Sequence, residues 1–153
     1  MAKSIRTWNV GKEVSCLQIE IFEGNYDKSK FYSHMGKYFA EPKYQKEMPY
    51  LANKEGSVWF LVFEGNVLIA FASLHELKNK MVFEHSYVEE PYRKKGIWKK
   101  LNENRFKYAS NKNKPIEVIT KEEFLKDYWI KNGFEVYRQN GRYYYLRRDI
   151  DES

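Results

Sequence analysis

The stretch Val88–Asn104, VEEPYRKKGIWKKLNEN, joins an apolar run to a helical pattern through a short and strongly basic turn. The residues before it, MVFEHSYV, have the aromatic and β-branched content of a strand. After it, apolar residues recur at helical spacing on one side of a helix expected from about Lys94 to Ser110. The sequence therefore predicts a strand, a turn and a helix in immediate succession.

This turn is a candidate anion-binding site. The first N–H groups of a helix have no partner within the helix, and the helix dipole adds positive potential there. Gly96 would let the backbone approach a phosphate closely, while Arg93, Lys94 and Lys95 add charge around the same point. A single glycine among cations is also typical of a solvated surface turn, so these residues alone leave both interpretations open.

The rest of the chain predicts six further strands and three further helices. The strands are expected at EVSCLQIEIF (13–22), SVWFLVF (57–63), VLIAFASLH (67–75), IEVI (116–119) and in both arms of FEVYRQNGRYYYLRR (134–148). The helices are expected at SKFYSHMGKYF (29–39), PKYQKEMPYLANK (42–54) and EEFLKDYWIKNGF (122–134). This order favours an α/β (α+β) sandwich in which four helices flank a mixed, mostly antiparallel sheet of about seven strands.

Single residues indicate where the helices begin and end, and which side of the last helix faces the core. Ser29 is the expected N-cap of the first helix, and Pro49 should kink or end the second. Gly133 is placed to end the last helix. Four side chains of that helix should face inward, namely Phe124, Leu125, Tyr128 and Trp129.

Composition narrows the class of protein. With 153 residues, 42% of them apolar, we expect one folded domain spanning residues 1–153. Cys16 is the only cysteine and the three histidines lack partners at metal-ligand spacing, so neither an internal disulfide nor a metal site is expected. The longest apolar run has six residues and the start lacks a signal peptide's apolar core, so we expect a cytoplasmic protein that does not span a membrane. The net charge of +6 suits a nucleic acid or a phosphorylated cofactor as partner, and equally a soluble protein with neither.

The turn and its surroundings resemble the GCN5-related N-acetyltransferase (GNAT) superfamily. Its signature is Arg or Gln, two variable residues, Gly, one variable residue, then Gly or Ala, and Arg93 and Gly96 match its first two fixed positions. The order of elements resembles the family over nearly the whole chain, and YWIKNGF with the terminal hairpin looks like its last helix and strands. The resemblance extends to Val88, Tyr92, Lys95, Ile97, Lys99, Lys100 and Leu101. It implies a GNAT-like three-layer sandwich and an acyl-coenzyme A, such as acetyl-CoA, as co-substrate.

The resemblance also implies which residues bind that cofactor. The backbone of Ser86 and Val88 would pair with the pantetheine arm. The pyrophosphate would lie against the turn formed by Arg93, Lys94, Lys95, Gly96, Ile97 and Trp98. Trp98 departs from the family, which has Gly or Ala there, so its indole would either obstruct the pyrophosphate or turn into the core.

Catalytic candidates follow from the same resemblance. The two-residue period of a strand predicts one shared face for Val82, Glu84, Ser86 and Val88. The resemblance implies that Glu84 stands where family members often carry an acid facing the cleft, and it is the expected general base. His85 would point to the opposite face and is the weaker choice.

The expected proton donor is less well matched to the family. Trp129 stands where many members have a tyrosine that acts as general acid, and Tyr128 is its neighbour about 100° around the helix. Tyr128 is therefore either the general acid or a core aromatic. A backbone N–H near Tyr87 or Val88 would stabilise the oxyanion, by analogy with the family.

The resemblance predicts an N-acyltransferase that moves an acetyl or related group from acyl-CoA to an amine. Two alternatives use the same fold: a protein that modifies or binds nucleic acid, like the related phage Mom proteins, and a non-catalytic interaction module. The basic helix and the aromatic hairpin RYYYLRR favour the first alternative. The departures at Trp98 and Trp129 favour the second. No motif identifies the acceptor. A homodimer is implied only because members of the superfamily often form dimers.

Overall fold

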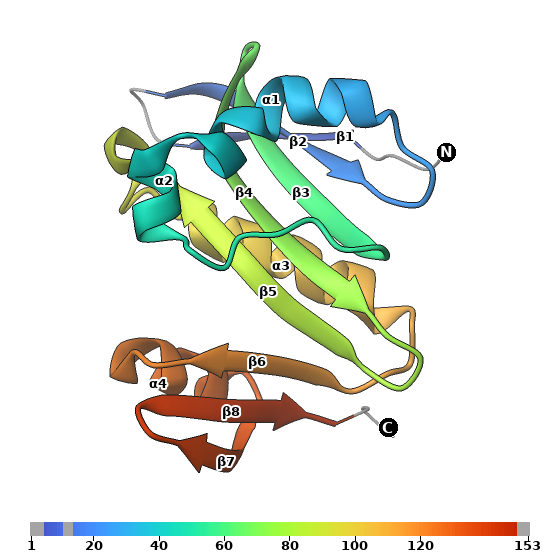
Figure 1. Cartoon of the computed structure of the whole chain (residues 1–153), viewed down its shortest axis with the longest axis vertical. Helices are drawn as coiled ribbons and strands as arrows, with labels where there is room; N and C mark the ends of the chain where they lie inside the picture. Colours follow the sequence, from blue (N-terminus) through green and yellow to red (C-terminus); the bar gives the residue numbers. More distant parts are fainter. Residues whose placement is uncertain (1–4, 11–13, 150–153) are drawn as a thin grey trace.

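The computed structural model describes residues 5–10 and 14–149, and within them it shows one eight-stranded sheet with helices on both faces (Figure 1). The strand order is β1-β2-β3-β4-β5-β6-β8-β7, and every neighbouring pair is antiparallel except β5 and β6. The strands are β1 (Ile5–Val10), β2 (Val14–Phe22), β3 (Ser57–Glu64), β4 (Val67–Glu76), β5 (Met81–Val88), β6 (Ile116–Thr120), β7 (Glu135–Asn140) and β8 (Tyr143–Arg148). The helices are α1 (Lys28–Ala40), α2 (Pro42–Glu47), α3 (Ile97–Ser110) and α4 (Glu123–Lys131), with a short 3₁₀ turn at Glu90–Tyr92.

The predicted fold class is confirmed, with one strand more than expected. All seven predicted strands and all four predicted helices are present. The additional strand is β1, which pairs antiparallel with β2 and forms one edge of the sheet.

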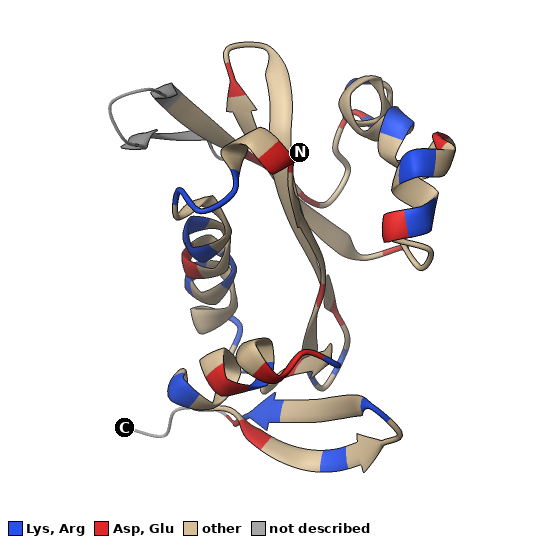
Figure 2. Ribbon diagram, turned by 90° about the vertical axis from the view of Figure 1, so that its left-hand side faces the viewer, with Lys and Arg blue, Asp and Glu red and all other residues tan. Residues whose placement is uncertain are grey.

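The sheet separates two hydrophobic cores, which makes the molecule three layers thick (Figure 2). Phe31 of α1 packs with Trp59 on one face, and Leu101 of α3 packs with Phe60 on the other. β3 is buried along seven of its eight residues, because both of its faces are covered. Within the described ranges, none of the helices is both long and apolar enough to cross a bilayer.

The N-terminal ends of α1 and α3 differ from the sequence predictions, because a local hydrogen bond fixes the first and the backbone angles of the turn fix the second. Asp27, not Ser29, caps α1, since its Oδ1 accepts from Lys30 N at 3.1 Å. α3 begins at Ile97 instead of Lys94, because Lys94 (φ 62°) and Gly96 (φ 82°) adopt left-handed conformations that no helix can continue.

Two further predictions about helices meet different outcomes. α2 ends at Glu47, two residues before Pro49, as the proline predicted. Phe124 was expected to face inward but is 69% exposed, because it lies on the outer side of α4 while Trp129 is buried.

The sheet opens between its two parallel strands. β5 and β6 are paired only at Met81 with Ile116 and at Val82 with Glu117. Beyond these pairs the strands diverge, which Figure 1 shows as a widening gap towards the C-terminal end of β5. The open edge of β5 therefore lies next to the turn that leads into α3.

A β-bulge interrupts β5 at this opening. Ala72 faces Ser86 and Leu74 faces Phe83, so Ser73 alone lies opposite both Glu84 and His85. The bulge overturns the prediction that Glu84 shares a face with Ser86 and Val88. Glu84 lies beside His75 and His85 stacks on Trp59, on the α1 side of the sheet, whereas Val88 packs into the α3 core.

Candidate active site

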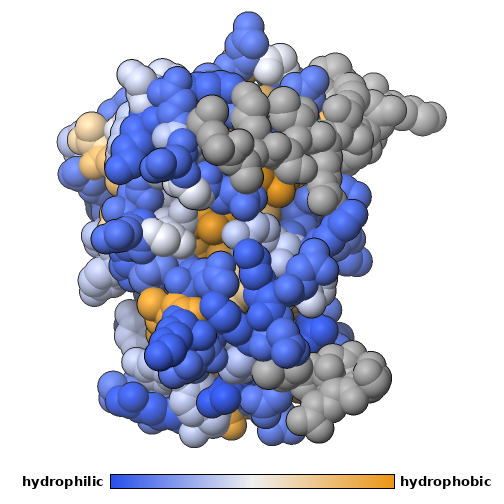
Figure 3. Space-filling view, turned by 90° about the vertical axis from the view of Figure 1, so that its right-hand side faces the viewer, coloured by the Kyte–Doolittle hydropathy of each residue, from blue (hydrophilic) through white to orange (hydrophobic). Residues whose placement is uncertain are grey.

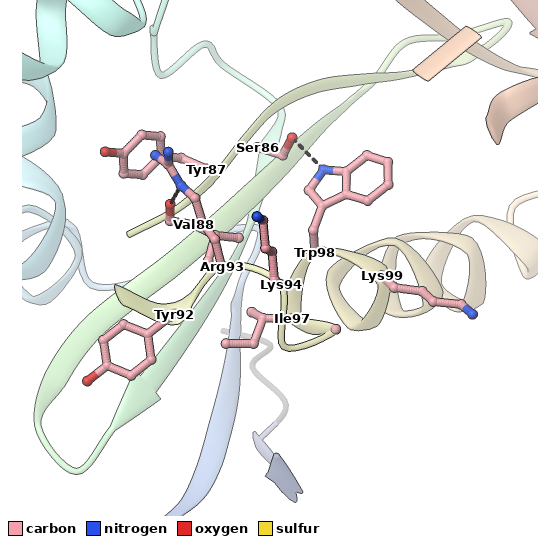
Figure 4. Close-up of a pocket in the computed structure, with 10 residues that line it drawn as sticks. Ser86, Tyr87, Val88, Tyr92, Arg93, Lys94, Ile97, Trp98 and Lys99 are labelled. Carbon is pink, nitrogen blue, oxygen red and sulfur yellow. Dashed lines mark hydrogen bonds between the residues drawn. The ribbon is translucent and has the colours of Figure 1, made fainter. Parts of the chain in front are cut away.

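A pocket of about 450 Å³ lies where β5 gives way to α3 (Figure 4). Its wall combines the end of β5 with the basic turn and the first residues of α3. The lining residues are Ser86, Tyr87, Val88, Tyr92, Arg93, Lys94, Gly96, Ile97, Trp98 and Lys99. We call it the turn pocket. It contains every residue predicted to bind the cofactor except Lys95, which does not line it.

The open edge of β5 presents backbone groups to the turn pocket. Glu89 N donates to Ile69 O at 2.9 Å, which fixes the direction of that amide toward β4. Because successive N–H groups of an antiparallel strand point to alternate sides, the amides of Val88 and Ser86 point away from β4 into the gap. These are the two residues predicted to pair with a pantetheine arm.

The start of α3 offers the turn pocket unpaired N–H groups. No side chain caps the helix, and the N-cap residue is Gly96. A Cβ at Gly96 would meet nothing within 4 Å, so the glycine is needed for its left-handed φ of 82° and not for the space it leaves. The free amides and the helix dipole together favour an anion at this point.

The basic residues of the turn divide into distinct roles. Arg93 folds back on β5: its Nε donates to Val88 O at 2.7 Å, and its guanidinium lies 5.4 Å above the Tyr87 ring. Lys94 points into the space between Arg93 and Trp98, whereas Lys99 points away along α3 (Figure 4). Lys94 is therefore the cation best placed for an anion in the turn pocket, while Arg93 holds the end of β5.

The Trp98 indole neither covers the helix amides nor sinks fully into the core. Its Nε1 donates to Ser86 Oγ at 3.0 Å, so the ring reaches from α3 across to β5 (Figure 4). The ring packs 4.8 Å from Tyr128 and 6.0 Å from Trp129, centroid to centroid, and is half-buried. It forms a wall of the turn pocket on the side away from Arg93.

A second pocket, of about 380 Å³, lies on the other side of that wall. It is bounded by the segment after α2, by the bulge of β5, by β6 and by α4, and we call it the bulge pocket. Its lining includes Glu47, Tyr50, Glu84, His85, Ser86, Trp98, Arg105, Glu122, Trp129 and Tyr143. Ser86 and Trp98 line both pockets.

Both candidate bases face the bulge pocket. Glu84 Oε2 lies 2.7 Å from Lys54 Nζ, and its Oε1 lies 3.8 Å from His75 Nδ1, with the side chain 14% exposed. His85 stacks on Trp59 at 6.0 Å with an angle of 12° between the rings. Burial lowers the pKa of His85 below its ordinary value of 6.5, so its imidazole is neutral near pH 7. His85 was expected to point away from Glu84, and the bulge brings the two onto one side.

The last helix places its two aromatic residues differently. Trp129 is buried and lines the bulge pocket. Tyr128 lines neither pocket, and its hydroxyl lies 3.5 Å from Asn102 Nδ2 on α3. Its role as proton donor stays a prediction, and the observed contact is with the α3 core.

Two groups of polar side chains around the site were missed from the sequence. Glu89, just after β5, accepts hydrogen bonds from Tyr38 Oη at 3.1 Å and Tyr44 Oη at 2.6 Å, which ties α1 and α2 to the site. Burial and the Glu89 carboxylate raise the pKa of both tyrosines, and they raise the pKa of Tyr87 to about 12. No sequence pattern identifies these pairs, since each joins residues more than forty positions apart.

The second group is centred on Arg105, which is 2% exposed. Its Nη1 donates to Ser73 O and its Nη2 to Asn102 Oδ1, beneath the bulge. Here a signal existed, because Arg105 continues the apolar stripe of Ile97 and Leu101 at four-residue spacing.

A third and larger pocket, of about 970 Å³, is formed by the loops after β2, before β3 and after β4. None of the predicted site residues lines it. Figure 3 shows this side of the molecule as mostly hydrophilic, with small scattered hydrophobic areas. Among residues 5–10 and 14–149, no group of three or more His, Cys, Asp or Glu is arranged to hold a metal ion.

Comparisons with solved structures find this architecture in acetyltransferases. ElaA from Escherichia coli matches with a TM-score of 0.67 and 16% identity over 87% of this chain and 99% of that one. An acyl-CoA N-acyltransferase from Pseudomonas aeruginosa matches with a TM-score of 0.70 and 14% identity over 86% and 99%. The PaiA N-acetyltransferase from Thermoplasma acidophilum, in complex with coenzyme A, matches with a TM-score of 0.55 and 20% identity over 82% and 81%. At these identities the likeness shows the fold.

Sequence comparisons address the family itself. No curated protein matches the chain significantly. The family model described as the acetyltransferase (GNAT) family matches residues 18–134, which include β5, the basic turn and α3. The chain therefore belongs to the acetyltransferase (GNAT) family, whose enzymes use an acyl-coenzyme A as co-substrate.

Proposed function

We propose that this protein is an N-acyltransferase that transfers an acetyl or related acyl group from acyl-CoA to an amine. One observation carries the proposal: an anion-binding helix start and a pocket lined by candidate bases lie on either side of the same two residues, Ser86 and Trp98. A cofactor that bound its phosphates at the first could present its thioester to the second.

The cofactor would be held mainly by backbone groups. Its pyrophosphate would accept hydrogen bonds from the free amides at the start of α3, with Lys94 adding charge. Its pantetheine arm would pair with the outward amides of Ser86 and Val88 along the open edge of β5. Arg93 contributes indirectly, because its bond to Val88 O fixes that edge.

Glu84 is the proposed general base. An amine nitrogen attacks the thioester carbonyl, the C–N bond forms, and the C–S bond breaks to release the coenzyme A thiolate. Glu84 would accept the proton that the amine loses, and the ion pair with Lys54 would hold the carboxylate in position. The oxyanion donor, an N–H near Tyr87 or Val88, stays a prediction, because Val88 lines the turn pocket whereas Glu84 lines the bulge pocket. Tyr128 stays a candidate for protonating the thiolate.

The amine would be admitted through the bulge pocket. Its outer walls include Tyr50, in the segment after α2, and Tyr143 at the start of β8, and both side chains are exposed. Whether the amine belongs to a small molecule, a peptide or a nucleobase is a question for the assay, and homodimer formation and a cytoplasmic location stay predictions.

A nucleic-acid acceptor is the second candidate. Lysine and arginine residues lie along α3 and on the terminal hairpin (Figure 2). That hairpin also exposes Tyr137 at 50% and Tyr143 at 42%, side chains on which bases could stack. Salt-dependent retention of single-stranded DNA or RNA would favour it.

Cofactor binding and turnover test the proposal directly. We expect acetyl-CoA to raise the unfolding temperature with the logarithm of its concentration above Kd, since a ligand at 100 times its Kd stabilises the native state by about 2.7 kcal/mol. A panel of small amines, peptides and oligonucleotides assayed for coenzyme A release then identifies the acceptor class. An unmoved unfolding temperature at saturating acetyl-CoA contradicts the enzyme proposal and favours a non-catalytic scaffold.

A further inference from the structure

Ser86 and Trp98 form the partition between the turn pocket and the bulge pocket. They line both pockets, and the Trp98 Nε1 to Ser86 Oγ hydrogen bond of 3.0 Å joins α3 to β5 across the gap (Figure 4). No other residue is shared by the two linings.

The partition is held firmly on one side and weakly on the other. The indole packs against Tyr128 and Trp129, which belong to α4 and the α3 core. Towards β5 the indole N–H donates its one hydrogen bond to the Ser86 hydroxyl. Both α4 rings also have contacts away from the indole: Tyr128 Oη lies 3.5 Å from Asn102 Nδ2, and the Trp129 ring lies 5.2 Å from that of Phe134.

The proposed reaction requires a path through this partition. A pyrophosphate at the start of α3 lies in the turn pocket, and a thioester within reach of Glu84 lies in the bulge pocket. The pantetheine arm between them must run along β5 past Ser86, where the indole edge now lies.

We propose that the Trp98 indole is a gate. It closes the path along β5 between the two pockets until the pantetheine arm of the cofactor displaces it from Ser86. This inference rests on the proposed function and names the step at which the cofactor is admitted. When no cofactor is bound, the indole keeps the bulge pocket closed to the turn pocket.

The free energy needed to move the indole away from Ser86 determines how much each substitution should change the affinity for coenzyme A. A ligand that binds only the open form has its affinity reduced by the fraction of molecules that are open. A neutral hydrogen bond of ordinary net strength changes that fraction by about 2- to 10-fold. Removing the bond from either partner should therefore tighten coenzyme A binding by about 2- to 10-fold.

The test compares coenzyme A with 3′-phosphoadenosine 5′-diphosphate, which carries the phosphates but lacks the arm. Calorimetric titrations of both ligands would be made on the wild type and on Ser86→Ala, Trp98→Phe and Trp98→Ala. Trp98→Phe keeps a packed ring but loses the N–H, so it should behave like Ser86→Ala even if Trp98→Ala folds poorly. Phe124→Ala, an exposed aromatic on α4, is the matched control and should bind both ligands as the wild type does.

We expect tighter coenzyme A binding in the three variants and unchanged binding of the arm-less ligand. Variants that bind coenzyme A no tighter than the wild type overturn the gate but leave the proposed function intact. An equal gain for the arm-less ligand also overturns it, because the indole would then obstruct the phosphates. If neither the wild type nor any variant binds coenzyme A, both the gate and the proposed function fall. Binding by the variants alone supports the gate and contradicts the proposed function of the wild type.

Discussion

Arg105 Nη1 donates a hydrogen bond to Ser73 O at 2.9 Å, reaching from α3 through the core to the strand that faces the bulge. The same nitrogen lies 3.4 Å from His85 O, and the guanidinium stacks 4.6 Å from the Phe83 ring. Burial lowers the pKa of Arg105 to about 9, which shows how completely this cation is withdrawn from water. The Arg105 side chain thus ties α3 to the bulge that turns Glu84 and His85 to one side.

Arg105→Met should destabilise the protein because it leaves the Ser73 and His85 carbonyls without a donor. Hydrogen bonds to a charged group contribute about 1.5–3 kcal/mol each, so we expect a loss of roughly that size in unfolding free energy. Urea unfolding monitored by tryptophan fluorescence measures it. Lys107→Met, on the exposed side of the same helix, is the control. Equal midpoints for the two variants would show that the guanidinium does not hold the bulge.

His85 should make stability depend on pH. Its pKa is lowered in the folded state by burial, so the unfolded chain takes up a proton first as the pH falls. The contribution of neutral His85 is complete above its ordinary value of 6.5 and is lost as the pH falls from there through the folded pKa. His85→Phe keeps the ring on Trp59 but cannot titrate.

We therefore expect the wild type to lose more unfolding free energy than His85→Phe between about pH 7.5 and about pH 5. Urea midpoints at the two pH values provide the comparison. Parallel losses in both proteins would mean that His85 titrates as it does in the unfolded chain.

Asp27→Ala should weaken the start of α1, because its carboxylate accepts the Lys30 amide. Loss of an N-cap costs about 0.5–2 kcal/mol. Ser29→Ala, which changes a residue inside the first turn, should cost less than about 0.5 kcal/mol. Chemical unfolding of both variants checks the assignment, and a larger effect at Ser29 would restore the cap predicted from the sequence.

Glu84→Gln should slow acyl transfer by about 10²- to 10⁴-fold, the usual contribution of a general base. Acetyl-CoA affinity should not change, because Glu84 lines the bulge pocket and not the turn pocket. Thiol release with the best acceptor measures the rate, and calorimetry measures the affinity. Glu55→Gln, an exposed neighbour of Lys54, is the control. Unchanged turnover in Glu84→Gln would transfer the role of base to His85 or to solvent.

Two glycines should respond to alanine in opposite directions. Gly96 has a φ of 82°, and a side chain in a left-handed conformation costs about 1–2 kcal/mol. Gly36 lies within α1, where a Cβ would meet nothing within 4 Å, so Gly36→Ala should gain about 0.5–1 kcal/mol. Thermal unfolding of the pair tests both signs. A neutral Gly96→Ala would mean that the turn readily adopts another conformation.

Much of the fold was readable from the sequence. The seven expected strands and four helices were found because alternation, helical spacing and hairpin turns such as Asn140-Gly141 are local properties. The errors also had local causes. The first turn of α3 was placed too early, because a run of charged residues does not reveal the left-handed backbone at Lys94. Phe124 was assigned to the core because apolar content alone does not say which side of a short helix is covered.

The candidate site was only partly readable. The turn pocket contains the predicted residues from Arg93 to Trp98 apart from Lys95, since strand, turn and helix follow one another directly in the chain. The face of Glu84 was predicted wrongly, because a bulge depends on the strand opposite and not on the sequence of β5 itself. Arg105 was not singled out from the sequence, although it is among the most buried side chains of the described residues.

The succession of the predicted strands and helices along the chain, the glycine turn and the family signature were determined by the amino-acid sequence alone, because each depends on residues adjacent in the chain. The tertiary structure decided which way Trp98 points, because the Ser86 hydroxyl that holds it comes from another element, twelve residues earlier. It also decided that β5 and β6 part after two residue pairs, which leaves room beside β5. Contacts of this kind form between separate elements. They depend on how the two cores pack against the sheet and cannot be predicted from residues adjacent in the chain.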